Sequence, residues 1–171
     1  MYFRNAKELL KVCQEQGLSI SAVMLQRELT EGEQDPEETD RKMDRVLEIM
    51  KSAASTPIHT PVKSMGGLIG GEAKKISDHK DAGKSLCGDL LERAVIYAMA
   101  TLETNASMGV IVASPTAGSA GIVPGLLLAL QETYDLSDEQ IKQGLYNASA
   151  IGYLAMRNAT VAGAVGGCQA E

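Results

Sequence analysis

Leu90-Leu-Glu-Arg-Ala-Val-Ile-Tyr-Ala-Met-Ala-Thr-Leu102 is the stretch of this 171-residue chain that decides its fold. Between Ala94 and Ala100 the apolar residues cover almost every side of a helix, rather than one stripe of it. A helix of that kind is buried by its neighbours, so we expect this one at the centre of the molecule. The predicted fold class is all-α: a helical domain with glycine-rich loops between buried helices.

Further helices are expected on both sides of this central one. Asp35 is a good helix cap, and Pro36 suits a first turn because its missing N–H would have no helical partner there. The chain is predicted to form a single domain over residues 1–171, with a helical front section (1–55) and a section that carries the site (56–171). The expected helices cover Asn5 to Gln16, Ser19 or Ser21 to Glu31, Asp35 onward, Pro124 to Tyr134, and Ser137 to about Asn158.

The overall composition narrows the possible classes of function. A net charge of −6 disfavours a nucleic-acid-binding surface. The longest apolar runs are short and broken by Gly or Pro, so no membrane-spanning helix is expected. Three widely separated cysteines, Cys13, Cys87 and Cys168, argue against a disulfide framework and for a reducing cytoplasm.

Two glycine-rich segments are the candidates for ligand binding. The first, Val62–Lys84, lacks apolar periodicity and is expected to be a long loop that contains Lys63-Ser-Met-Gly-Gly-Leu-Ile-Gly-Gly71. Its glycines, with Lys63 and Ser64, could bind an anion through backbone N–H groups and charge. The second, Ser114–Gly125, offers hydroxyls and N–H groups at a helix start, which suits a carboxylate; the alternative is a tight glycine turn.

Two asparagines and one cysteine complete the set of candidates. Asn105 and Asn158 follow apolar helices, and they could either orient a polar ligand or cap those helices. Cys168 follows a Gly-Gly pair, which lets the backbone approach a bulky group. Its thiol is either a soft-metal ligand or nucleophile, or an inert thiol packed at a helix end. His59 and His79 are expected at the surface or in loops, because neither has a partner at metal-ligand spacing.

Two segments of the chain resemble parts of the α subunit of iron–sulfur-dependent L-serine dehydratase. They are Ser114-Pro-Thr-Ala-Gly-Ser-Ala-Gly-Ile-Val-Pro-Gly125 and the segment from Asn158 through Gly-Gly-Cys168-Gln-Ala-Glu171. The resemblance extends over nearly the whole chain and includes the glycine stretch from Met65 to Glu72. The family's glycine loop typically reads Leu-Thr-Gly-Gly-Asp, where this chain has Leu68-Ile69-Gly70-Gly71-Glu72, and Ile69 cannot supply the threonine hydroxyl.

The resemblance implies a largely helical domain that holds a 4Fe-4S cluster through three cysteines. Cys168 matches the first, and the other two are expected beyond Glu171, so the chain is expected to be a C-terminally incomplete α subunit that is inactive alone. The implied reaction deaminates L-serine to pyruvate and ammonia. The open iron would act as a Lewis acid on the substrate hydroxyl, and a base that the sequence does not identify would remove the Cα proton.

The resemblance also implies roles for individual residues and a partner. A β subunit is the expected partner, because Met1 begins directly with the α-type helix; a higher oligomer is left open. Two alternatives stand beside the dehydratase: a related L-cysteine desulfidase, or a non-catalytic subunit that binds an amino acid or holds a partner. The carboxylate of L-serine would be held by Ser114, Thr116, Gly118 and Ser119, and its other polar groups would be oriented by Lys63, Ser64, Asn105 and Asn158.

Overall fold

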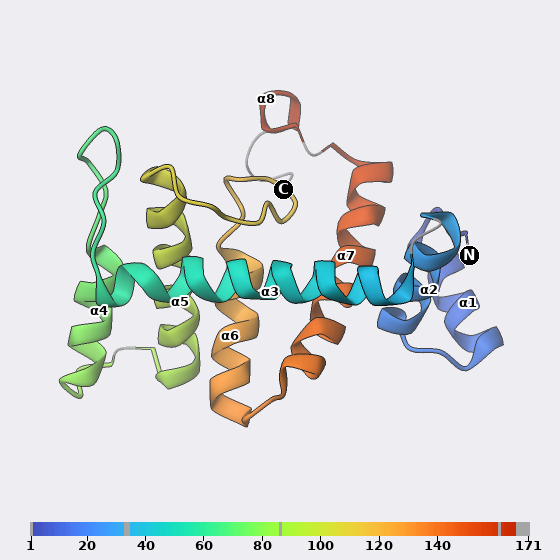
Figure 1. The fold of residues 1–171 in the computed structure, drawn as a ribbon, viewed down its shortest axis with the longest axis horizontal. Coiled ribbons are helices and arrows are strands. Elements are labelled where there is room, and N and C mark those ends of the chain that lie inside the picture. Colours follow the sequence, from blue (N-terminus) through green and yellow to red (C-terminus); the bar gives the residue numbers. More distant parts are fainter. Residues whose placement is uncertain (1, 33–34, 86, 161, 167–171) are drawn as a thin grey trace. The chain divides into compact units, whose positions relative to one another are not determined.

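The computed structural model describes residues 2–32, 35–85, 87–160 and 162–166, and within these ranges it contains eight helices and no strand (Figure 1). The predicted all-α class is therefore confirmed. None of the helices in the described ranges is long and apolar enough to cross a membrane. The helices are α1 Ala6–Gln16, α2 Ile20–Glu31, α3 Pro36–His59, α4 Glu72–Asp81, α5 Asp89–Ala106, α6 Ile122–Tyr134, α7 Asp138–Asn158 and α8 Gly163–Gly166.

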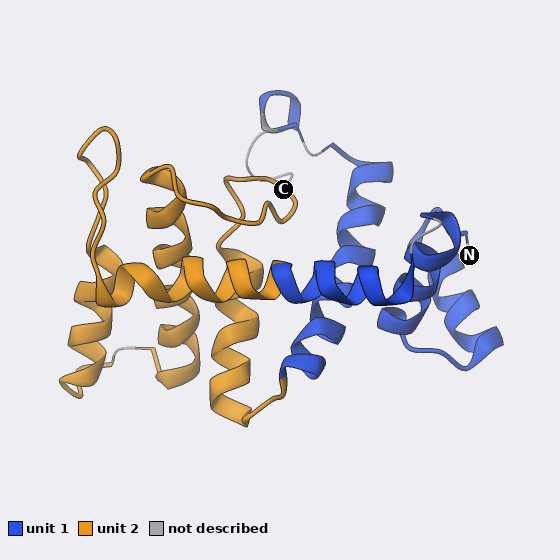
Figure 2. Cartoon of the chain, in the orientation of Figure 1, with its two compact units in different colours: residues 1–45, 138–171 blue, residues 46–137 orange. Residues whose placement is uncertain are grey.

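Two compact units divide the chain (Figure 2). Unit 1 joins residues 1–45 to residues 138–171, and unit 2 is the continuous stretch 46–137. Helix α3 belongs to both units, because the boundary falls inside it, between Arg45 and Val46. The predicted division at residue 55 into a front section and a site-bearing section stays a prediction.

Local capping residues set the helix starts in unit 1. The side chain of Asn5 accepts a hydrogen bond from the Glu8 N–H (2.9 Å), and that of Ser19 accepts one from the Ala22 N–H (3.2 Å). These bonds satisfy N–H groups that have no partner inside a helix. The predicted starts of the first two helices are thereby confirmed to within one residue.

The core of unit 1 is built from α1, α2, α7 and the N-terminal segment. Burial of a large apolar side chain contributes about 1.5–3 kcal/mol, so the cluster at this core is a major source of stability for the unit. The half-buried Cys13 packs against it. The buried members of the cluster are Phe3, Leu9, Val23, Met24, Tyr146, Ala150 and Leu154.

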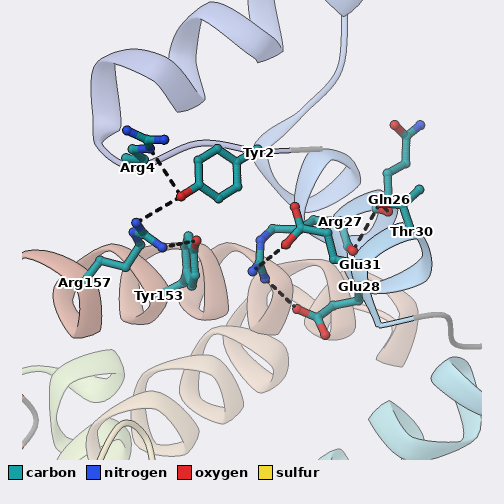
Figure 3. A network of polar contacts seen from close by, with 9 residues as sticks. All are labelled: Tyr2, Arg4, Gln26, Arg27, Glu28, Thr30, Glu31, Tyr153 and Arg157. Atoms are coloured by element: carbon teal, nitrogen blue, oxygen red, sulfur yellow. Dashed lines mark hydrogen bonds and ion pairs between the residues drawn. The ribbon is translucent and has the colours of Figure 1, made fainter.

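The N-terminal segment packs against the last turns of α7 (Figure 3). Phe3 is fully buried and meets the Tyr153 ring edge-on, with 5.3 Å between ring centroids. The Arg157 guanidinium donates to the hydroxyls of Tyr2 (3.1 Å) and Tyr153 (3.2 Å). Arg4 also donates to the Tyr2 hydroxyl (3.2 Å), and this hydrogen bond lowers the pKa of the Tyr2 phenol below its usual value, because a cationic donor favours the phenolate.

Lys142 of α7 is buried, and three carboxylates reach its ammonium group. Its Nζ lies 2.6 Å from an oxygen of Asp40, 3.0 Å from one of Asp44 and 3.2 Å from one of Glu139. Asp40 and Asp44 lie in the part of α3 that belongs to unit 1, so the lysine binds that segment to α7. The hydrogen bond to Asp40 raises the pKa of Lys142 above its usual value.

In unit 2, helices α4, α5 and α6 run in alternating directions, so the N-termini of α4 and α6 lie at the same end as the C-terminus of α5 (Figure 1). Helix α5 packs against both neighbours. A Cβ at Gly121 would lie 2.6 Å from the Ala98 carbonyl oxygen, and one at Gly125 would lie 2.7 Å from the Ala94 carbonyl oxygen. Glycine at these two positions is therefore what allows α6 to approach α5 so closely.

The prediction of a long loop over residues 62–84 is wrong in its second half, where the chain forms α4. This helix is polar on most sides and fully buries Ala73, so its apolar periodicity is too weak to indicate a helix. Lys74 binds Asp78 one turn further on (2.7 Å), which supports the helix without an apolar stripe.

The prediction that the central helix is buried on every side is also wrong. Helix α5 exposes Leu91, Val95 and Leu102 by 56%, 38% and 40%, whereas Glu92 and Glu103 are buried. Although α4 and α6 both pack against α5, they leave these apolar side chains uncovered, and the two glutamates lie on covered parts of the helix.

Candidate functional site

The last turn of α5, residues 103–106, contacts both glycine-rich segments of unit 2. The Met65 N–H donates to the Ala106 carbonyl oxygen (3.2 Å). The side chain of Asn105 donates from Nδ2 to the Ala117 carbonyl oxygen (3.2 Å). Two loops that are far apart in the sequence are therefore held at one helix end.

Thr104 fixes this turn in place. Its Oγ1 donates to the Ala53 carbonyl of α3 (2.8 Å), and its own carbonyl accepts from the Gly109 N–H (2.8 Å). A Cβ at Gly109 would lie 2.6 Å from Thr104 Cγ2, so the chain can leave the helix along this path only with glycine there. Met108, just before it, has a left-handed backbone (φ 64°), which costs a non-glycine residue about 1–2 kcal/mol. The chain thus carries local strain beside the candidate site.

Ser64 closes the loop of residues 62–71. Its N–H donates to the Ile69 carbonyl oxygen (2.8 Å), and its hydroxyl oxygen accepts from the Ile69 N–H (3.1 Å). At Gly70 the backbone has φ +144°, and a Cβ there would lie 2.0 Å from the Val62 carbonyl oxygen. The two sides of the loop therefore touch at Gly70. Lys63, next to Ser64, is exposed, so its ammonium group can reach a ligand.

Glu103 binds the end of this loop from the interior of unit 2. It is 2% exposed, and its two carboxyl oxygens accept from the N–H groups of Gly71 (3.0 Å) and Ala73 (2.8 Å). Gly71 is the N-cap residue of α4 and has no side chain with which to cap the helix. Glu103 of α5 therefore supplies the cap from a distant part of the chain.

Glu72 adds a second carboxyl group at the same place. Its Oε2 accepts from the Gly70 N–H at 2.6 Å. This hydrogen bond lowers the pKa of the Glu72 carboxyl below its usual value, because the charged form is the better acceptor. The N-terminal dipole of α4 favours negative charge in the same position. The loop therefore ends on two carboxyl groups that bind backbone N–H groups.

In the segment between α5 and α6, the hydroxyl groups contact one another. Thr116 Oγ1 and Ser119 Oγ lie 3.1 Å apart, and Ser119 Oγ also donates to the Ser114 carbonyl oxygen (3.1 Å). The Thr116 N–H donates to Ser119 Oγ (3.3 Å), and Gly118 is exposed beside them. Helix α6 begins shortly afterwards, at Ile122. The arrangement fits both the predicted carboxylate site and its alternative, a tight turn at a helix start.

The structure brings most of the predicted substrate-binding residues to one end of unit 2. Asn158 lies in unit 1, where its Nδ2 donates to the carbonyl oxygens of Arg4 (3.0 Å) and Leu154 (2.9 Å). Cys168 lies outside the described residues. The residues on or beside the last turn of α5 and its two loops are Lys63, Ser64, Asn105, Ser114, Thr116, Gly118 and Ser119.

The described part of the chain does not form a metal centre by itself. Within those ranges, no group of three His, Cys, Asp or Glu side chains is placed to hold a metal ion. Cys13 packs against the core of unit 1, and Cys87 is exposed in unit 2. A 4Fe-4S cluster is held by several cysteine thiolates together, so these residues do not fit it.

Sequence analysis missed Glu103 and the carbonyl of Ala106. Glu103 had a usable signal, because it is an ionisable residue in a mostly apolar stretch, and a buried carboxyl group must find hydrogen-bond donors. Ala106 acts through its backbone, and no side-chain pattern indicates that role.

Known proteins resemble this chain over most of its length. The family model described as serine dehydratase alpha chain matches residues 15–171. The probable L-serine dehydratase alpha chain of Bacillus subtilis (strain 168) is 44% identical over 169 residues, which is 99% of this chain and 56% of that relative. The L-serine dehydratase alpha chain of Peptoniphilus asaccharolyticus is 39% identical over 167 residues, 98% of this chain and 57% of the relative. An L-serine dehydratase of Streptomyces coelicolor is 34% identical over 175 residues, 99% of this chain and 37% of the relative.

Fold and loops together describe an all-helical protein in which two polar, glycine-rich loops meet at one helix end. The chain belongs to the serine dehydratase alpha chain family. It spans a little more than half the length of the Bacillus and Peptoniphilus relatives.

Proposed function

We propose that this chain forms the substrate-binding part of an enzyme that converts L-serine to pyruvate and ammonia. Family membership supports the reaction, and the relatives in Bacillus subtilis and Peptoniphilus asaccharolyticus carry the name L-serine dehydratase. The observation that carries the proposal is the meeting of two polar loops at residues 103–106 of α5.

The loops offer groups that complement an α-amino acid. Lys63 supplies an exposed cation for the carboxylate. The Thr116–Ser119 turn places two hydroxyl groups near the N-terminus of α6, where they would exchange their present hydrogen bonds for bonds to the carboxylate. Asn105 uses Nδ2 to bind Ala117, while its Oδ1 has no hydrogen-bond partner among the described residues. That oxygen can accept a hydrogen bond from the substrate ammonium group.

The family resemblance extends the proposal to a 4Fe-4S cluster, with Cys168 as one ligand, and to a β subunit as partner. The relatives' designation as alpha chains supports the partner. A bound cluster would supply a Lewis-acidic iron for the serine hydroxyl. Because the described residues do not fit the cluster, their proposed roles are to bind the carboxylate and orient the ammonium group. Loss of water from serine gives aminoacrylate, and its hydrolysis returns that water and releases pyruvate and ammonia.

Binding of L-serine to the 171-residue chain tests the assignment of the loops. Asn105→Ala is expected to weaken binding by about 10- to 150-fold, because a lost hydrogen bond to a charged group costs about 1.5–3 kcal/mol. Asn147→Ala is the matched control, since Asn147 also begins an Asn-Ala-Ser sequence but is exposed on α7. Titration calorimetry measures both affinities. Equal affinities of the wild type and Asn105→Ala for L-serine would show that Asn105 does not bind it. If the wild type does not bind L-serine, the assignment of the two loops as its binding site is wrong.

The complete enzyme tests the reaction and the cluster. Under anaerobic conditions we expect pyruvate release from L-serine. A preference for L-cysteine, with release of sulfide, would show that the enzyme is a desulfidase and not a dehydratase. Cys168→Ala is expected to abolish iron binding in the complete enzyme. An unchanged iron content would remove Cys168 from the ligand set.

A further inference from the structure

Glu103 is a buried carboxyl group whose hydrogen bonds lead directly to the first loop. Its two oxygens accept from the N–H groups of Gly71 and Ala73, at 3.0 and 2.8 Å. The first N–H groups of a helix have no acceptor within that helix, so another group must satisfy them when they are buried. The place of the α4 N-terminus against α5 therefore depends on this carboxyl group.

The other attachment of the loop lies one turn further along α5. The Met65 N–H donates to the carbonyl oxygen of Ala106, the last residue of α5, whose carbonyl has no acceptor role inside the helix. Between the two attachments, Gly70 leaves no room for a Cβ, and Glu72 Oε2 holds its N–H. The loop is thus bound at Met65 and at Gly71 to the last turn of α5.

The second loop is bound to the same turn through a separate bond. Asn105 Nδ2 donates to the Ala117 carbonyl oxygen, and Glu103 takes no part in that bond. A change at Glu103 would therefore move the first loop while the second keeps its attachment. The relative position of the two loops depends on Glu103.

We propose that Glu103 is a positioning residue, whose carboxyl group sets where the loop of residues 62–71 places Lys63 and Ser64 relative to the turn at residues 114–119. The identity of the ligand, L-serine, rests on the proposed function, whereas the hold of Glu103 on the loop is independent of it.

Glu103→Gln tests this role, because it keeps the shape of the side chain but turns an NH₂ group toward one of the two N–H donors. In the 171-residue chain, amide hydrogen exchange measured by NMR is expected to become at least about tenfold faster at Gly71 and Ala73. Exchange across α6 is expected to stay unchanged. L-Serine is expected to bind this variant at least about fivefold more weakly in calorimetric titration.

Glu92→Gln is the matched control. Glu92 is another buried glutamate of α5 (5% exposed), and its Oε2 has no hydrogen-bond partner among the described residues. We expect this variant to leave the exchange of Gly71 and Ala73 unchanged. If Glu92→Gln increased the exchange rate at Gly71 and Ala73 as much as Glu103→Gln does, the result would contradict a specific role for Glu103.

Further outcomes separate this inference from the proposed function. Unchanged exchange at Gly71 and Ala73 in Glu103→Gln overturns the inference, and so does an equal acceleration across α4, α5 and α6. Faster loop exchange with unchanged L-serine affinity also overturns the positioning role. If the wild type does not bind L-serine, the proposed function fails, while amide exchange still decides whether Glu103 holds the loop.

If Glu103→Gln does not fold, the amide exchange of the wild type is the test. Slow exchange at Gly71 and Ala73 supports the hold of Glu103 on the loop, and exchange at the rate of free amides overturns it.

Discussion

Lys142 and Glu103 are ionisable side chains that the fold buries, and their hydrogen-bond partners differ in kind. Glu103 binds backbone N–H groups, which no substitution except proline can remove. Lys142 binds three carboxylates whose side chains are 61%, 59% and 67% exposed. Water can replace Lys142 at these carboxylates, but Lys142 is only 7% exposed, so water replaces the carboxylates around its ammonium group less readily. The two sides of this ion-pair cluster should therefore respond differently to mutation.

Removing carboxylates is expected to cost more than removing the lysine. Asp40→Asn combined with Asp44→Asn leaves the buried ammonium group with Glu139 alone, and should lower the free energy of unfolding by up to about 3 kcal/mol. Lys142→Met keeps most of the packing and leaves solvated carboxylates, so its expected change is within about 1 kcal/mol. Urea unfolding followed by circular dichroism measures both, and a larger loss in Lys142→Met than in the double variant would contradict this account.

The same cluster predicts how stability changes at alkaline pH. Because Asp40 raises the pKa of Lys142, the folded chain binds that proton more tightly than the unfolded chain does. Its contribution is complete below the unfolded pKa of about 10.4 and is lost as the pH rises through the higher folded pKa. The difference in unfolding free energy between wild type and Lys142→Met should thus be constant from about pH 6 to 9 and decline above about 10.4. A constant difference up to the alkaline limit of stability would speak against it.

At the scale of helices, two glycines in helix interiors have opposite surroundings. A Cβ at Gly125 of α6 would meet α5 at 2.7 Å, so Gly125→Ala is expected to destabilise the protein by about 1–3 kcal/mol through overpacking. A Cβ at Gly152 of α7 would have no neighbour within 4 Å, so Gly152→Ala is expected to stabilise it by about 0.5–1 kcal/mol through helix propensity. Thermal unfolding compares the two, and shifts of the same sign would refute the packing argument.

Helix starts could be predicted from the sequence where the cap is local. Asn5 and Ser19 each bind an N–H three residues later, so the sequence contains both partners of the bond within one turn. Helix α4 could not be predicted in this way, because its cap is Glu103 on another helix. Its core-facing side is also narrow, since Ala73 is the residue that it fully buries.

The candidate site was predictable where polar residues stand out between apolar helices. Asn105 and Ser119 stand out in that way, and the structure places both at the end of unit 2 where the loops meet. The attachment of the loops was not predictable, because it uses the Ala106 carbonyl and the N–H groups of Gly71 and Ala73. Backbone groups are present at every position, so they leave no mark in the sequence.

At the scale of the whole molecule, each unit buries its own set of apolar side chains. Phe3→Ala removes a fully buried ring from unit 1 and is expected to cost about 3–5 kcal/mol. Amide exchange should become faster in α1, α2 and α7 and stay unchanged in α4, α5 and α6. Leu10→Ala, on the 53% exposed Leu10 of α1, is the control and should change stability by about 0.5 kcal/mol or less. Equal acceleration in both units after Phe3→Ala would show that they unfold together.

Unit 1 is assembled from two stretches of chain that a ribosome makes at different times. Residues 46–137 are contiguous, so unit 2 can collapse as it leaves the exit tunnel, while the first 45 residues still lack α7. At about 5–20 residues per second, the intervening stretch takes roughly 5 to 20 s to synthesise. During that interval Phe3, Leu9 and Val23, which end up buried, lack α7 to cover them. Helices α1 and α2 are thus made before unit 2 but are packed against α7 only after it, and the nascent segment of residues 1–45 is where chaperone capture or misassembly should concentrate.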